Sequence, residues 1–292
     1  MKGDEKLWAI LNDKLDTLLA ANSLDEAIRV AQSTLELAKR TFPASRIELG
    51  LSYEKLGLLH DQKGDRSTAK LYLTDAHRLF EGVLPPDRHA LFRSARRLAR
   101  LCDDLGEKEE AIAFYQKAIA DANQIRGLPY AELGTLLNNA ALCFRRAGRG
   151  KAAEPYYLHA LQIYEEHLGP DHPDVASVLN NLGVFYTNEK RFSEAEKTHL
   201  RALAIREKTL PATHSDIAQS KCNLAVVYHS RGDYQRASEL YRASLNAWEE
   251  AMSRPPQEYE VVASNYADLL RSLGEAKKAR ALEQHARKKR RG

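Results

Sequence analysis

Small residues recur along this chain at a fixed interval of 42 positions. One alanine marks each period, and these anchor alanines are Ala27, Ala69, Ala111, Ala153, Ala195, Ala237 and Ala279. The residue seven positions after each anchor is also small, and so is the residue twelve positions before every anchor but the first, where Leu15 stands. Since a small side chain lets two helices cross closely, these columns predict repeated helix crossings.

Larger apolar residues keep the same register. They occupy columns thirteen and nine positions before the anchor and four positions after it, including Leu56, Leu98, Leu182, Leu224, Phe144, Tyr186, Tyr228, Tyr115 and Tyr157. Between the two apolar segments of most periods lies a glycine, such as Gly64 or Gly232, which supplies the left-handed backbone that ends a helix. Each period therefore predicts two helices joined by a turn, and the fold class is all-α.

Composition supports this interpretation and limits the kind of protein. Hydrophobic residues make up 43% and charged residues 29% of the 292 positions, and glycine and proline are few. The three cysteines, Cys102, Cys143 and Cys222, form neither an even set nor a CxxC pair, so we expect a reducing compartment. The amino terminus lacks the apolar core of a signal peptide, and no apolar run approaches the roughly 20 residues that cross a bilayer. We expect a cytoplasmic protein.

The spacing of small and aromatic residues resembles that of the tetratricopeptide repeat, which is W-x2-L-G-x2-Y, then A-x3-F, then A. The fifth period matches best, with Leu182, Gly183, Tyr186 and Ala195, and with His199 where an aromatic residue is usual. The long period, and the segment ALQIYEEHLGPDHPDVASVLNNLG with its echo one period later, resemble the cargo-binding repeats of kinesin light chains and their bacterial relatives. The resemblance implies a right-handed superhelical solenoid of seven tetratricopeptide-like helix pairs.

We expect one solenoid to span residues 1–292. Its predicted repeats lie near 5–46, 47–88, 89–130, 131–172, 173–214, 215–256 and 257–290. The first and last repeats depart from the pattern, as expected for terminal repeats that need one soluble face. A basic tail covers residues 287–292; a solvated helix end is one interpretation of it, and contact with nucleic acid or anionic lipid is the other.

The resemblance implies that a second stripe of each first helix lines a concave groove. In one column of this stripe, fourteen positions before the anchor, stand Lys55, Arg97, Asn139, Asn181, Asn223 and Asn265. A carboxamide both donates and accepts hydrogen bonds, so an asparagine ladder suits the backbone of an extended peptide. The alternative is that these asparagines bond the neighbouring helix.

Arginines cluster in the third repeat. Arg93, Arg96, Arg97 and Arg100 share one helix face, and Arg145 adds a cation on the next first helix. This face is predicted either to bind a carboxylate or phosphate, for which the planar guanidinium is suited, or to be neutralised by Glu54, Asp103 and Asp104.

No nucleophile, paired-histidine or phosphate-loop motif emerges from the remaining residues. We therefore expect a protein–protein interaction scaffold, and not an enzyme, that binds an extended acidic peptide segment in its groove. The alternative is a nucleic-acid-associated regulator that uses the arginine cluster and the basic tail. We expect a protein partner in preference to nucleic acid, with no cofactor, metal ion or membrane, and the sequence leaves the oligomeric state open.

Overall fold

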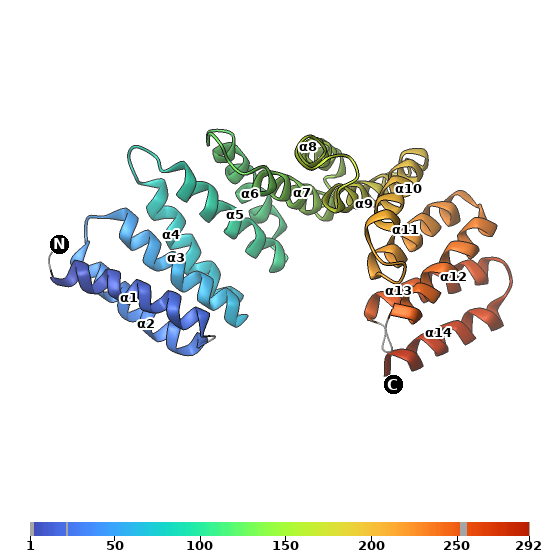
Figure 1. The fold of residues 1–292 in the computed structure, drawn as a ribbon, viewed down its shortest axis with the longest axis horizontal. Coiled ribbons are helices and arrows are strands. Elements are labelled where there is room, and N and C mark those ends of the chain that lie inside the picture. Colours follow the sequence, from blue (N-terminus) through green and yellow to red (C-terminus); the bar gives the residue numbers. More distant parts are fainter. Residues whose placement is uncertain (1–2, 22, 252–255, 292) are drawn as a thin grey trace. The chain divides into compact units, whose positions relative to one another are not determined.

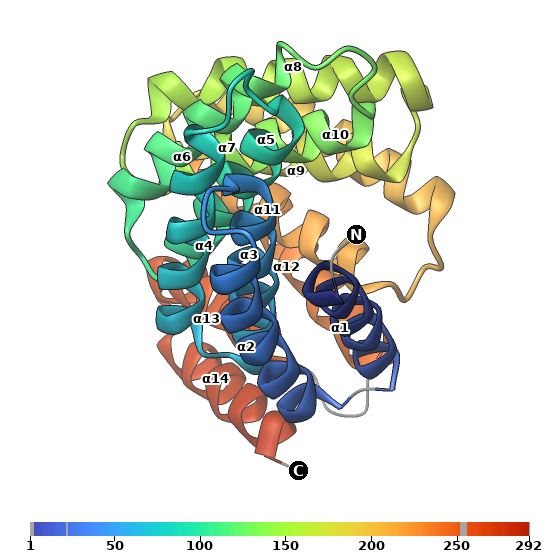
Figure 2. The same ribbon diagram turned by 90° about the vertical axis from the view of Figure 1, so that its left-hand side faces the viewer.

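The computed structural model describes residues 3–21, 23–251 and 256–291, with the side chains of residues 251, 290 and 291 excepted. These residues form helices and turns, without a strand (Figures 1 and 2). The helices of the described residues are α1 (Gly3–Ala20), α2 (Leu24–Thr41), α3 (Arg46–Lys63), α4 (Arg66–Glu81), α5 (Arg88–Asp104), α6 (Lys108–Ala122), α7 (Tyr130–Arg146), α8 (Gly150–Leu168), α9 (Pro173–Asn188), α10 (Phe192–Thr209), α11 (Ser215–Arg231), α12 (Tyr234–Ala251), α13 (Gln257–Ser272) and α14 (Ala276–Arg291).

Each predicted repeat contains two of these helices, which confirms the all-α class and the 42-residue period. The chain divides into two compact units, Met1–Arg149 with α1 to α7 and Gly150–Gly292 with α8 to α14. Within each unit every helix packs against the next, as α3 does against α4 and α11 against α12. The division falls in the turn after α7, inside the fourth predicted repeat.

The small-residue columns lie where the sequence places them, in the packed interior. All seven anchor alanines are fully buried. Two positions show why the column twelve residues before the anchor must be small. A Cβ atom on Gly57 would lie 2.6 Å from Leu73, and one on Gly183 would lie 2.6 Å from the His199 ring. Larger residues there would push the paired helices apart.

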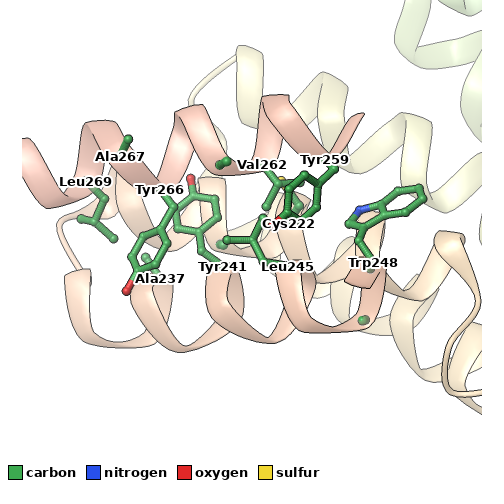
Figure 3. Close-up of a cluster of buried hydrophobic side chains, with 14 of the residues drawn as sticks. Cys222, Ala237, Tyr241, Leu245, Trp248, Tyr259, Val262, Tyr266, Ala267 and Leu269 are labelled. Atoms are coloured by element: carbon green, nitrogen blue, oxygen red, sulfur yellow. The ribbon is translucent and has the colours of Figure 1, made fainter. Parts of the chain in front are cut away.

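Aromatic residues fill the space between the helices of the second unit (Figure 3). Tyr241 of α12 and Tyr266 of α13 stack with ring centroids 5.6 Å apart. Tyr259 and Trp248 continue this cluster along the same two helices, and Cys222 reaches it from α11 (Figure 3). The bulky columns of the sequence therefore form the core between neighbouring repeats.

Glycine and histidine residues in the turns determine where several helices end and begin. Gly64 and Gly232 end α3 and α11 with φ values of 86° and 82°, a region that favours glycine. His172 and His214 occupy equivalent positions before α9 and α11, and each ring accepts a hydrogen bond from the backbone N–H two residues later. The helices thus begin and end where the repeat register requires.

The terminal helices differ from the others. In α1 the side chains of Leu7 and Ile10 are exposed, while Trp8 donates from its indole Nε1 to Ser52 Oγ at 3.1 Å and so ties α1 to the second repeat. The start of the basic tail is solvated at Arg287 and Lys288, whereas the side chains of residues 290–292 lie outside the described residues. None of the described helices has the length and apolar character needed to cross a membrane.

Candidate functional site

A hollow of about 310 Å³ opens on the first unit, and all of its lining comes from α3, α5, α6 and α7. We call it the arginine hollow. Its lining residues are Leu58, Arg96, Arg97, Arg100, Tyr115, Thr135, Leu136 and Asn139. Four of the predicted site residues, Arg96, Arg97, Arg100 and Asn139, are therefore brought together, although α5 and α7 belong to different repeats.

Helix periodicity places these arginines on one face of α5. The opposite face buries Leu91, Ala95, Leu98 and Cys102 in the interior, which leaves the arginine positions directed away from the core. The guanidinium-bearing side chains are partly covered, from 28% exposed at Arg97 to 51% exposed at Arg100. They are neither free surface charges nor core residues.

Arg93 and Arg97 share one acceptor, the carboxylate of Glu54 on α3. Arg93 donates to it through Nε at 3.0 Å and through Nη2 at 3.0 Å, and Arg97 donates through Nη1. The Glu54 side chain is only 6% exposed, so its charge depends on these two partners. This ion-pair group fixes both arginines relative to α3.

The other two arginines of the cluster also have carboxylate partners. Arg96 donates to Glu132 of α7 at 2.8 Å, and Arg100 donates to Asp104 at 3.1 Å and to Asp61 of α3. Glu54 and Asp104 were predicted from the sequence as neutralising residues, whereas Asp61 and Glu132 were not. Asp103, also predicted as a neutralising residue, pairs with Arg146.

Local charge is therefore balanced. The four arginines at positions 93, 96, 97 and 100 face four carboxylates, those of Glu54, Asp61, Asp104 and Glu132. This arrangement favours internal neutralisation as one role of the cluster. It also holds three guanidinium groups at fixed positions around an open volume, which a ligand site requires.

The two remaining predicted cations lie elsewhere. Lys55 donates to Asp16 of α1 at 3.3 Å and lines a second hollow, of about 130 Å³, with Leu15, Leu19 and Leu59. Arg145 is half-buried on α7, its Nε lacks a hydrogen-bond partner among the described residues, and it does not line the arginine hollow. Arg145 therefore does not share the hollow with the other arginines.

The asparagines are half-buried, and those of the second unit have partners within the protein. Asn223 of α11 donates to Asn180 of α9 at 2.8 Å and accepts from Gln219 at 2.9 Å. Asn265 of α13 interacts with the Cys222 thiol, whose pKa is raised to about 12 by burial although the hydrogen bond from Asn265 opposes the shift. Bonds to the neighbouring helix therefore occur in this column, as the alternative interpretation holds.

One group of metal-ligating residue types comes together among the residues that the structure describes: Cys102, Glu107 and Glu110. The ammonium group of Lys70 lies 2.6 Å from both glutamates. Burial works against its charge, but the two hydrogen bonds raise the pKa of Lys70. The carboxylates already have a cation, and burial raises the pKa of the Cys102 thiol to about 12.

Comparison with known proteins identifies the family. A family model described as Tetratricopeptide repeat matches residues 132–208, 174–250 and 216–291, and a second model with the same description matches residues 97–120. This chain belongs to the tetratricopeptide-repeat family. The matched region includes every helix from α8 to α14, so family membership rests on the second unit and on part of the first.

A kinesin light chain-related protein is among the proteins that this chain resembles. The chain is 25% identical over 152 residues to Protein KINESIN LIGHT CHAIN-RELATED 3 of Arabidopsis thaliana, covering 52% of this chain and 23% of that protein. The chain thus spans about a quarter of that relative's length. It is 28% identical to BtubC (BKLC) from P. vanneervenii, with a TM-score of 0.63 over 80% of this chain and 94% of that one.

A third similarity concerns the fold alone. A tetratricopeptide repeat protein from Parabacteroides merdae is 14% identical, and its structure gives a TM-score of 0.67 over 96% of this chain and 92% of that one. The helix-pair architecture is therefore shared well beyond recognisable sequence identity.

Proposed function

We propose that this protein is an interaction scaffold that binds an extended, acidic segment of another protein along its first helices. The observation that carries the proposal is the convergence of Arg96, Arg97, Arg100 and Asn139 on one open hollow. Tetratricopeptide repeats generally mediate protein–protein interactions, and the similarity to kinesin light chain proteins agrees with a partner-binding role.

The residues have distinct roles in this proposal. The guanidinium groups of Arg96, Arg97 and Arg100 bind the acidic side chains of the ligand. Arg93 donates to the same Glu54 carboxylate as Arg97 and so helps to orient the Arg97 side chain. Carboxamides of the asparagine column bond the peptide backbone, which needs both a donor and an acceptor. The proposed peptide-binding residues are Lys55, Arg93, Arg96, Arg97, Arg100, Arg145, Asn139, Asn181, Asn223 and Asn265.

A double variant and a matched control test the proposal without leaving a buried carboxylate unpaired. Arg96→Ala with Asn139→Ala removes one guanidinium and one carboxamide from the hollow, and the carboxylate left behind, Glu132, is itself 39% exposed. Arg191→Ala is the matched control, because Arg191 is a half-exposed arginine with carboxylate partners on the second unit.

Fluorescence anisotropy with a labelled peptide of alternating glutamate and serine gives the readout. The double variant is expected to bind at least about tenfold more weakly than the wild type, or about 1.4 kcal/mol, and the control to bind normally. Equal affinity of wild type and double variant would contradict the proposal. Tighter binding of a DNA duplex, with a steep loss of affinity as salt rises, would favour the nucleic-acid alternative.

A further inference from the structure

Unused donor groups surround the arginine hollow. Arg96 and Arg97 each donate through Nη1 to a carboxylate, and the structure gives neither of them another hydrogen-bond partner among the described residues. A guanidinium has five N–H donors, so most donors of these two side chains are uncommitted. Arg100 holds two carboxylates and stands on the same wall. The carboxylates fix the guanidinium groups without exhausting their hydrogen bonds.

The number of acceptor oxygens distinguishes the anions that can use these free donors. Because Glu54, Asp61, Asp104 and Glu132 already match the four arginines, a ligand carboxylate brings the same single charge and the same two oxygens that the arginines already have. A phosphate monoester carries about −1.5 to −2 charges at pH 7 and three acceptor oxygens. It can therefore bridge several guanidinium groups while their carboxylate partners stay in place.

The remaining walls of the hollow suit the same group. Tyr115 is buried at the hollow, where burial raises the pKa of its phenol, so the phenol remains neutral at physiological pH and does not repel an anion. Asn139 presents a carboxamide to the same volume. The hollow of about 310 Å³ is open to solvent, which leaves room for a phosphate group together with the side chain that bears it.

We infer that the arginine hollow is a phosphomonoester subsite that recognises a phosphorylated serine or threonine in the bound segment, an inference that rests on the proposed function. Phosphorylation of the partner then acts as the signal for docking. The acidic ligand of the proposed function is then specifically a phosphate monoester.

Titration of the full chain with three small probes tests the inference: blocked phosphoserine, blocked glutamate and inorganic phosphate. The arginine Nε–H signals in NMR spectra report binding at the hollow. Blocked phosphoserine is expected to bind at least about tenfold more tightly than blocked glutamate at pH 7.5. Its affinity should fall at pH 5, because the second phosphate pKa is about 6, whereas glutamate remains charged over this range.

Two variants separate the fork geometry from charge. Arg96→Lys keeps the cation that pairs with Glu132 but removes the planar fork, and it is expected to weaken phosphoserine binding severalfold. Glu132→Gln releases Arg96 from its carboxylate and is expected to strengthen binding. Arg191→Ala, outside the hollow, should leave the affinity unchanged.

The outcomes that overturn the inference differ from those that overturn the proposed function. Equal binding of phosphoserine and glutamate, or the absence of shifts at the arginine signals, removes the phosphate subsite. Inorganic phosphate that binds as tightly as blocked phosphoserine would make the hollow a site for the free ion and would equally overturn the inference. The scaffold proposal fails separately, if the glutamate–serine peptide is insensitive to the Arg96→Ala and Asn139→Ala double variant.

Discussion

In both units the same positions of neighbouring first helices meet, but the residues at these positions are charged in the first unit and neutral in the second. In the first unit Arg97 of α5 reaches back to Glu54 of α3, and in the second unit Asn223 of α11 reaches back to Asn180 of α9. Both pairs join residues 43 positions apart. The repeat register therefore fixes which positions meet, while the residue type alone decides whether they form an ion pair or an amide pair.

A third pair extends the comparison. Asn265 of α13 meets the Cys222 thiol of α11 at the same sequence separation. The column fourteen positions before the anchor thus repeatedly contacts the column fifteen positions before the preceding anchor. Of these three contacts, only the one in the first unit is charged, and there a buried carboxylate makes its two arginines necessary. The two contacts in the second unit are between neutral groups that need no counter-charge.

The largest expected difference between the units follows from the burial of Glu54. Replacing Arg93 and Arg97 together with alanine leaves its carboxylate unpaired, and the expected loss of unfolding free energy is about 4 kcal/mol. Urea denaturation of the purified variant measures this loss. Adding Glu54→Leu should restore most of the stability, because the unpaired charge is then absent. A double variant as stable as the wild type would show that Glu54 does not depend on its arginine partners.

Acid should affect the second unit through His199. Burial lowers the pKa of His199 to about 4, with Arg206 acting in the same direction and a backbone hydrogen bond at Gly183 opposing the shift. An unfolded histidine binds its proton near pH 6.5, so the unfolded state binds more protons between pH 6.5 and 4. The stability contributed by the neutral ring is present above pH 6.5 and is lost as the pH falls toward 4.

By pH 4 this loss amounts to about 3 kcal/mol, which urea denaturation across the pH range measures. His199→Phe supplies the aromatic ring usual at this position of the repeat and should remove the His199 part of the acid sensitivity. Because burial also lowers the pKa of His77 in the first unit, the comparison must be made between wild type and variant. Identical pH profiles for the two proteins would contradict the prediction.

The smallest effect is expected at the amide pair. Asn223→Ala removes the hydrogen bonds to Asn180 and from Gln219, which join half-buried neutral side chains, and the expected loss is about 1 kcal/mol. Thermal unfolding followed by circular dichroism measures it. A loss as large as that of the Arg93 and Arg97 double variant would erase the proposed contrast between charged and neutral pairs.

The fold was largely predictable because the same pattern of packed residues recurs in every period of the sequence. Seven buried anchor alanines, and glycines at 57 and 183 that leave no space for a Cβ atom, are visible as columns before any coordinates exist. The carboxylates that hold the arginines were only partly predictable. Asp61 lies 39 positions before Arg100, the same separation as in the Glu54–Arg93 and Asp16–Lys55 pairs. A search for opposite charges slightly less than one period apart would have found it.

The arginine hollow itself could not be predicted from the sequence. Its walls come from four helices, and its volume depends on how far the Leu58 and Tyr115 side chains extend between them. Column positions specify neighbours but not the space that remains after packing. The same limit applied to Arg145, which shares the charge of the cluster but lies outside the hollow.

The hydrogen bonds and ion pairs between neighbouring first helices join positions about one period apart, and this spacing bears on how such a chain can evolve. Duplicating or deleting a complete 42-residue segment rejoins columns that already complement one another, so the array can lengthen or shorten without new core residues. Single substitutions in one polar column can then change which pairs form between neighbouring first helices. Glutamate facing arginine and asparagine facing asparagine are two such solutions within one gene product.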